Sequence, residues 1–230
     1  MEWLSNPEIW IALVTLTVLE IVLGVDNVIF ISILSAKLPV PQQRSARRLG
    51  LVLAMVARVG LLLSISWIIR LTEPLFAVAG HDFSGRDLTL LVGGLFLLAK
   101  STFEIHESLE SEEGHKSDKV TASFASVMFQ ILVLDVVFSL DSVITAVGMV
   151  EQIGVMVAAI IIAVAVMLLS AEAISAFVNE RPTVKILALS FLLLVGFSLV
   201  AEAFHQEIAK GYLYFAMAFS VFVELINQRI

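Results

Sequence analysis

The sequence contains no cysteine, and only 15% of its 230 residues are charged, whereas 59% are apolar. Without cysteine the chain has no disulfides, thiolate metal ligands or thiol chemistry, so a bound ion must use oxygen ligands or the four histidines. Low charge and a mean hydropathy of +0.99 are typical of membrane proteins. The net charge of −7 says little about partners, because several acids lie in the apolar runs and others crowd one loop, and we do not expect nucleic acid as a partner. We therefore expect an integral membrane protein in contact with the lipid bilayer.

Apolar runs of about 20 residues recur along the chain and predict an all-α membrane protein with seven transmembrane helices. The expected helices span roughly residues 9–34, 49–71, 87–105, 122–149, 153–178, 184–204 and 211–227, within one transmembrane domain of residues 1–230. The first run lacks the basic segment and the small-residue cleavage site of a signal peptide. We therefore expect it to be retained as a membrane span in a chain that starts near Met1.

Lysine and arginine are distributed unequally between the expected loops, which indicates an orientation because short cytoplasmic loops keep positive charge. The loops after the first, third and fifth helices and the carboxyl end hold Lys37, Arg44, Arg47, Arg48, Lys116, Lys119, Arg181, Lys185 and Arg229. The opposite loops hold only Arg86 and Lys210. We therefore predict that the amino end lies outside and the carboxyl end lies in the cytoplasm.

One sequence pattern occurs twice, as VLEIVLGVDNVI at residues 18–29 and as VLDVVFSLDSVI at residues 133–144. The alignment pairs Glu20 with Asp135, Gly24 with Ser139, Asp26 with Asp141 and Asn27 with Ser142. Three helices separate the two copies, which predicts two inverted three-helix repeats, at about 9–105 and 122–204, and an extra helix at about 211–227. GLFLLAK (94–100) and GFSLVAE (196–202) match weakly at equivalent places. Inverted repeats of this kind are typical of secondary transporters.

The repeated acids cannot share one face of a regular helix, because six residues rotate about 240° and rise about 9 Å. Either the helices unwind, with Gly24 and Ser139 as candidate points, or the partners of each acid come from other helices. We expect the two copies to converge at mid-membrane and to offer oxygen ligands to Mn²⁺, Ca²⁺ or Mg²⁺. The candidate ligands are Glu20, Asp26, Asn27, Asp135, Asp141 and Ser142.

The alternative is that these polar groups only hold helices together by hydrogen bonds. Four carboxylates argue against it, because each costs about 2.5–3.5 kcal/mol at the centre of a membrane helix, and serine or asparagine would serve more cheaply. The sequence therefore favours ion binding or proton carriage.

Four further polar residues in the expected helices have two interpretations each. Arg58 is either a counter-ion of the acids or part of an ion pair with no transport role. Lys100 and Glu202 either form a salt bridge between the two halves or extend to the membrane surface. Glu224, three residues before Asn227, either completes the site or a proton path, or is solvated near a helix end.

At EIVLGVDNVIF and LDVVFSLDSVITA the sequence resembles the TerC family of integral membrane proteins, within the LysE-like transporter group. The resemblance extends to RRLG, EIHE and YFAMAFSVFVELIN, and so covers nearly the whole chain. It implies a seven-helix protein of the bacterial inner (plasma) membrane, in a family whose members export Mn²⁺ or are linked to tellurium resistance or to metallation of exported proteins. The acidic motifs of the family fall on the six candidate ligands. Some members carry cytoplasmic regulatory domains, and we expect none after Ile230.

Three functions compete. An intramembrane aspartyl protease is disfavoured, because its acids resemble a Gly-x-Gly-Asp pattern whereas these read GVDN and SLDS. A membrane scaffold predicts that Asp to Asn changes are tolerated. We predict a divalent-cation exporter, not an enzyme, with no prosthetic group and with proton antiport by rocking of the two repeats. Oxygen ligands admit Mn²⁺, Ca²⁺ and Mg²⁺ alike, and the preference for Mn²⁺ follows from the resemblance.

Overall fold

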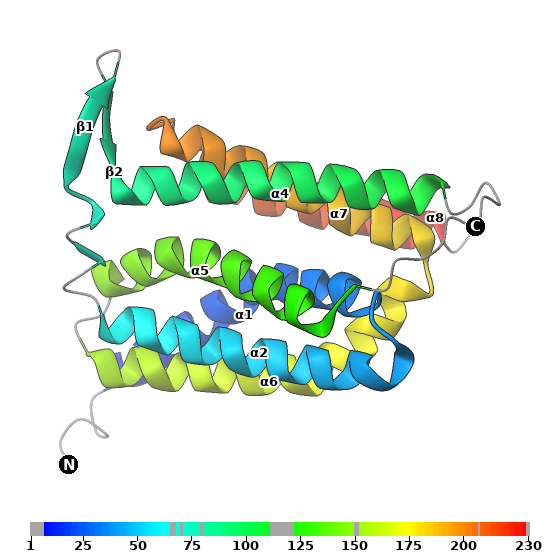
Figure 1. Cartoon of the computed structure of the whole chain (residues 1–230). Coiled ribbons are helices and arrows are strands. Elements are labelled where there is room, and N and C mark those ends of the chain that lie inside the picture. Colours follow the sequence, from blue (N-terminus) through cyan, green and yellow to red (C-terminus); the bar gives the residue numbers. More distant parts are fainter. Residues whose placement is uncertain are drawn as a thin grey trace. The chain divides into compact units, whose positions relative to one another are not determined.

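The computed structural model describes residues 7–64, 68–69, 71–78, 81–110, 122–149, 152–206 and 208–228. Its helices are α1 (Pro7–Ser35), α2 (Val40–Leu63), α4 (Gly85–Glu110), α5 (Phe124–Met149), α6 (Ile153–Asn179), α7 (Pro182–Ala203) and α8 (Lys210–Asn227). The strands β1 (Pro74–Val78) and β2 (His81–Ser84) form an antiparallel hairpin (Figure 1). The helical fold is therefore confirmed. The hairpin lies in a segment that we expected to be a loop.

Two helices extend by five residues or more beyond one of their expected ends, and α2 also ends at Leu63 rather than 71. α2 begins at Val40 rather than 49, with Pro41 in its first turn, where a missing backbone N–H removes no helical hydrogen bond. Gln43 Nε2 donates to the carbonyl of Leu38 at 2.9 Å and secures this start. α4 continues to Glu110 rather than 105. Because α2 begins at Val40, the arginines of RSARR lie on this helix and not in a loop.

Four of the described helices are long and apolar enough to cross a membrane by length and composition: α1, α4, α6 and α7. Residues 124–140 of α5 and 211–227 of α8 form shorter apolar helices. α2 carries four arginines: Arg44, Arg47 and Arg48 near its start and Arg58 within its apolar stretch. An integral membrane protein is therefore supported, and the full set of seven crossings stays a prediction.

The contacts divide the chain into two units. Unit 1 comprises Met1–Arg70 and Thr121–Ala176, with α1, α2, α5 and most of α6, and unit 2 comprises Leu71–Val120 and Phe177–Ile230, with the hairpin, α4, α7 and α8. Each unit contains helices from both expected repeats. Helices that occupy the same place in the two repeats lie in the same unit: α1 with α5, α2 with α6, and α4 with α7.

The buried faces of unit 1 correspond at constant offsets in the sequence. Adding 115 maps the buried Leu16, Glu20, Gly24 and Val28 of α1 onto Ile131, Asp135, Ser139 and Val143 of α5, all buried. Adding 109 maps Ala46, Gly50, Leu51, Ala54, Arg58 and Leu62 of α2 onto Val155, Ala159, Ile160, Ala163, Met167 and Ala171 of α6, all buried. Burial of the same face on equivalent helices is the pattern that a duplicated unit predicts.

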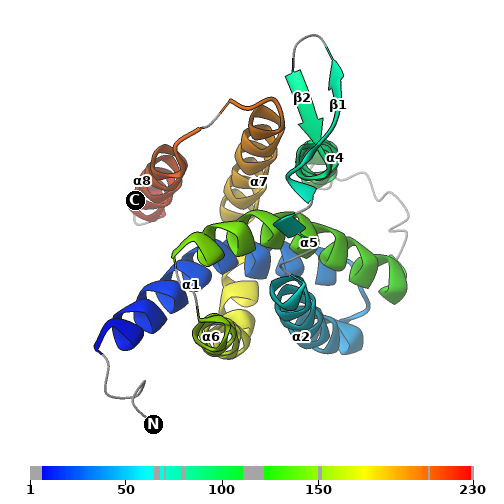
Figure 2. The ribbon, with the colours of Figure 1, turned by 90° about the vertical axis from the view of Figure 1, so that its left-hand side faces the viewer.

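In unit 2, α4 and α7 cross at two glycines and lie side by side (Figures 1 and 2). A Cβ atom added to Gly94 would lie 2.8 Å from the carbonyl oxygen of Gly196, and one added to Gly196 would lie 3.1 Å from that of Gly94. Gly94 also faces Val200 as Gly196 faces Leu98, and adding 102 maps Gly94 onto Gly196 and Leu98 onto Val200. Such reciprocal contacts define a local two-fold relation between α4 and α7, at the place of the weak match in sequence.

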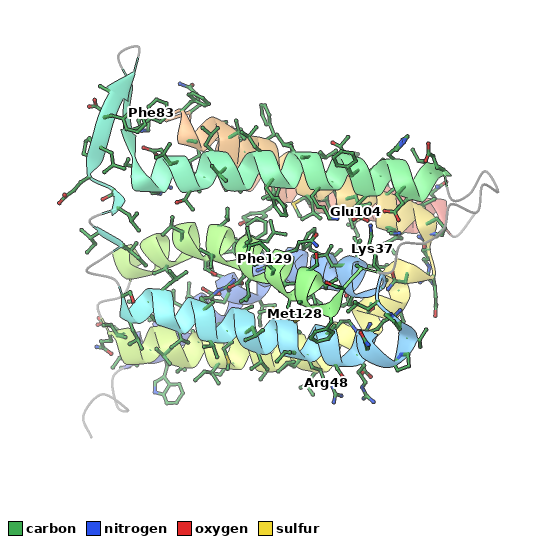
Figure 3. The ribbon with its side chains drawn as sticks, viewed as in Figure 1. Lys37, Arg48, Phe83, Glu104, Met128 and Phe129 are labelled. Carbon is green, nitrogen blue, oxygen red and sulfur yellow. The ribbon has the colours of Figure 1, made fainter. Side chains whose placement is uncertain are left out.

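Side-chain hydrogen bonds fix the junction between the hairpin and α4. Ser84 Oγ accepts from the backbone N–H of Asp87 at 3.2 Å, and Asp87 Oδ2 accepts from the backbone N–H of Ser84 at 2.9 Å, which is a capping box. Phe83, labelled in Figure 3, stacks on Phe76 and meets Phe204 edge-on, each with ring centroids 5.8 Å apart. The hairpin is thereby anchored to the start of α4 and the end of α7.

Candidate cation-binding site

The interior of unit 1 holds a charged cluster built on Arg58 of α2. Its Nη1 donates to Glu20 Oε2 of α1, and its Nη2 donates to Asp135 Oδ1 of α5 at 3.1 Å. Its Nε donates to Ser139 Oγ at 3.0 Å, and that hydroxyl donates to Asp135 Oδ2 at 3.2 Å. One guanidinium therefore joins Glu20 and Asp135, the equivalent acids of the two sequence copies.

This cluster is closed to its surroundings, since Glu20 and Arg58 are each 4% exposed, Asp135 is 3% exposed and Ser139 is fully buried. When both carboxylates are ionised, one guanidinium leaves a net negative charge. A charge buried in an apolar interior is tolerated only with a partner, so the site has a strong preference for cationic groups.

Small residues on α2 place Arg58 where it meets both acids. Gly50, Ala54 and Arg58 recur at intervals of four and therefore share one face of α2. A Cβ atom added to Gly50 would lie 3.1 Å from Cδ1 of Ile131 in α5 and 3.6 Å from Cγ2 of Ile31 in α1. The close approach at Gly50 lets the long side chain of Arg58, two turns further along, reach α1 and α5 together.

Neither copy of the motif unwinds, which corrects one expectation. α1 passes through Gly24 and α5 passes through Ser139 as continuous helix. Gly24 makes room for a side chain, because a Cβ atom there would lie 2.6 Å from both Sδ and Cε of Met167 in α6. The alternative expectation holds for Glu20 and Asp135, whose partner comes from another helix.

The second acid of each copy lies in a helix, but its side chain is outside the described part of the structure. This applies to Asp26 in α1 and to Asp141 and its neighbour Ser142 in α5, whereas Asn27 is half-buried. Among the residues that are described, no three or more His, Asp or Glu side chains form a group that could hold a metal. The set of six metal ligands therefore stays a prediction.

Lys100 and Glu202 do not pair with each other as one interpretation expected. Lys100 Nζ lies 2.9 Å from Glu104 Oε1, one turn further along α4, and Glu202 of α7 pairs with Arg86. Spacing along the sequence favours the first pair, since residues four apart share a helix face. The predicted Lys100–Glu202 salt bridge is therefore wrong, and Glu202 of the second repeat pairs instead with Arg86 of the first repeat.

Glu224 has a local role in unit 2. Its Oε1 accepts from Thr183 Oγ1 at 2.6 Å and from Gln228 Nε2 at 3.0 Å. These bonds tie α8 to the first turn of α7. The acids of the repeated motif belong to unit 1, so these contacts do not support Glu224 as part of the same site.

Met167 of α6 contacts the first copy of the motif at Gly24, and the sequence pattern did not identify it. It occupies in α6 the place that Arg58 occupies in α2, and it contacts Gly24 as Arg58 contacts the equivalent Ser139. Aligning GLVLAMVAR (50–58) with AIIIAVAVM (159–167) would have identified it, because Gly50 and Ala54 fall on Ala159 and Ala163.

Residues 5–230 match a known family, described as the integral membrane protein TerC family. The chain is 58% identical over 229 residues to a UPF0053 protein of Haemophilus influenzae, with 99% of this chain and 97% of that protein covered. It is 55% identical over 225 residues to the UPF0053 inner membrane protein YgdQ of Escherichia coli, covering 98% and 94%. The match to YoaE of Escherichia coli, 57% identical, spans 99% of this chain but only 44% of that inner membrane protein. No solved structure matches the chain.

Proposed function

Because the chain belongs to the TerC family of integral membrane proteins, often linked to ion and metal transport, we propose that it is a secondary transporter of a divalent metal cation. The proposed substrate is Mn²⁺, exported from the cytoplasm in exchange for protons. Two of the relatives are named inner membrane proteins, which supports a location in the inner membrane. They carry no name that specifies a substrate, so the metal is part of the proposal.

The observation that carries this proposal is the meeting of Glu20 and Asp135 on one guanidinium. These acids are equivalent in the two copies of the motif, and they come from α1 and α5. Carboxylates in an apolar interior are expensive, and a pair of them in one buried place is a characteristic of ion pathways rather than of helix packing. Carboxylate and amide oxygens are also the ligands that Mn²⁺ shares with Ca²⁺ and Mg²⁺.

We assign the second acids to the substrate as well. Asp26 and Asp141 follow Glu20 and Asp135 by six residues in continuous helices, which places their backbones about 9 Å further along each axis. Asn27 and Ser142 follow directly and add neutral oxygens. Because the two repeats would run in opposite directions, Asp26 and Asp141 would lie on opposite sides of Glu20 and Asp135, and each would give a cation a station on one side of that pair.

The duplicated architecture supports transport by alternating access. Two copies of a unit in opposite orientations can exchange their conformations, so that opening on one side of the membrane mirrors closing on the other. The constant offsets between buried faces, and the reciprocal crossing of α4 and α7, support such a duplication. Metal would leave the cytoplasm in one half of the cycle and protons would return on the carboxylates in the other.

Flux measurements in liposomes test the proposal. Purified protein is reconstituted, and the movement of Mn²⁺, Ca²⁺ and Mg²⁺ is followed with and without a pH gradient. We expect Mn²⁺ flux that a pH gradient accelerates and that Asp26→Asn or Asp141→Asn abolishes. Glu172→Gln is the matched control, because Glu172 is a carboxylate of the same unit whose side chain is 48% exposed and pairs with Arg44.

The outcomes distinguish the competing functions. Unchanged flux in both Asn variants would exclude the assigned site, and loss of flux in Glu172→Gln would show that the effect is not specific. A wild-type protein that moves no divalent cation would favour a membrane scaffold or a tellurium-resistance factor without transport.

A further inference from the structure

We propose that Arg58 is a tethered competitor of the transported cation: its guanidinium occupies Glu20 and Asp135, and the metal must displace it to reach those carboxylates. The inference rests on the proposed function, because it describes how substrate enters the same site. It goes further by giving Arg58 a part in each transport cycle instead of a permanent structural role.

The geometry shows that Arg58 and a metal cannot hold the same oxygens together. Each nitrogen of the guanidinium has a partner: Nη1 bonds Glu20, Nη2 bonds Asp135 and Nε bonds Ser139. The bonds come from three directions of one planar group and point to α1 and to two turns of α5. A metal bound by Glu20 and Asp135 would lie where the two carboxylates converge, which is the place of the guanidinium.

Charge favours the exchange. With Arg58 in place, the two carboxylates keep one net negative charge when both are ionised, in a cluster whose charged members are each 3–4% exposed. A divalent cation in the same place would neutralise both carboxylates. The low dielectric of the interior makes that difference large, so a divalent ion can displace a group that is attached to the protein and already in position.

The packing of a buried helix face does not by itself require arginine at this position. The equivalent place in α6 is taken by Met167, which is 5% exposed and packs on Gly24, the counterpart of Ser139. Methionine and arginine have unbranched stems of similar length, so the packing on a buried helix face accepts either. Arginine therefore supplies a charge on only one of two otherwise similar helices, and that charge is directed at the duplicated acids.

A tethered competitor lowers the apparent affinity for metal and speeds its release. If Arg58 holds the carboxylates for roughly nine-tenths of the time, the apparent affinity is about tenfold weaker than that of the free carboxylates. The same competition drives a bound metal off the site, because Arg58 returns to the oxygens as the metal leaves. Removal of Arg58 should therefore tighten binding and slow turnover together.

The test compares wild type with Arg58→Met, which copies the residue of the second repeat. We expect the Mn²⁺ concentration for half-maximal flux to fall by about tenfold and the maximum rate to fall as well. Added Mn²⁺ should also raise the melting temperature of Arg58→Met more than that of wild type, since the metal then neutralises two carboxylates that lack a counter-ion. Arg58→Lys keeps a charge but cannot bridge both acids as a planar fork does, so its half-saturation should lie between the two.

Arg86→Met is the matched control, because it removes an arginine that pairs with a carboxylate, Glu202, in unit 2. It should lower stability without tightening Mn²⁺ binding. If Arg58→Met does not fold, the lysine variant carries the test alone. Half-saturation that stays unchanged or rises in both Arg58 variants would overturn the inference, even when wild-type flux and its loss in Asp26→Asn uphold the proposed function. Absence of flux in wild type would instead reject the proposed function.

Discussion

The crossing of α4 and α7 predicts that Gly94→Ala destabilises the protein. A Cβ atom at this position would lie 2.8 Å from the carbonyl oxygen of Gly196, 2.8 Å from Cγ2 of Val200 and 3.0 Å from the backbone nitrogen of Val200. Two of these atoms belong to the backbone of α7, which cannot move away as the end of a flexible side chain could. The two helices must therefore separate or slide.

The magnitude follows from two opposing effects. Alanine is the better helix former, which stabilises a helix interior by roughly 0.5–1 kcal/mol relative to glycine. An extra methyl group in a packed interface costs about 1–3 kcal/mol, and contact with backbone places this site at the upper end. The net loss is about 2 kcal/mol, which lowers the melting temperature of a chain of this size by about 4–8 °C.

Thermal unfolding of the purified protein in detergent measures the effect, with two other glycines as controls. Gly60 of α2 has nothing within 4 Å of an added Cβ atom, so Gly60→Ala should be neutral or stabilising. Gly196→Ala should be intermediate, because its closest contact is 3.0 Å, to Cβ of Leu97. If Gly94→Ala is as stable as Gly60→Ala, the close approach of α4 and α7 is incorrect.

Three further predictions concern single side chains. Glu20→Gln keeps an acceptor oxygen for Arg58 and removes the excess negative charge, so stability should change by less than about 1 kcal/mol while Mn²⁺ flux is lost; a large fall in melting temperature would contradict this. Glu172→Gln breaks an exposed ion pair worth roughly 0–1 kcal/mol, so neither unfolding nor flux should change measurably. Ser84→Ala removes the capping box with Asp87 and should cost about 1 kcal/mol in thermal unfolding; an unchanged melting temperature would show that the cap is dispensable.

The sequence predicts the helices and the pairing of α1 with α5 because both depend on patterns that the chain itself displays. Apolar periodicity marks each helix, and the duplicated motif aligns Glu20 with Asp135, which the structure brings to one guanidinium. Small residues at equivalent places, such as Gly94 and Gly196, also become contacts. These features are local, or are repeated, and so can be read without knowing the packing.

Other features depend on packing that periodicity does not reveal. Arg44 and Arg48 suggest a loop because they are charged, yet they lie on a solvated face of α2 and pair with Glu172 of α6. Gly24 suggests a break in a helix because glycine favours many conformations, but here it accommodates Met167. Whether glycine bends a helix or admits a neighbour is decided by the neighbour.

The hairpin and the partners of Lys100 show the same limit. The strands Pro74–Val78 and His81–Ser84 are too short to produce a clear alternation, and their position is stabilised by Phe83 and Phe204 from separate segments. Lys100 has a nearer carboxylate, Glu104, on its own helix than the one that the weak repeat suggested. The hairpin therefore depends on a contact with a distant segment, and Lys100 on a contact within its own helix, and the sequence pattern indicates neither.

The most direct test of the central claim is an equilibrium titration of the purified protein with Mn²⁺, in which free Mn²⁺ is counted by electron paramagnetic resonance. The account predicts saturable binding in the wild type that is lost in Asp26→Asn and in Asp141→Asn and kept in Glu172→Gln. Identical binding curves for the wild type and both Asn variants would contradict it, because the duplicated acids would then not hold the metal.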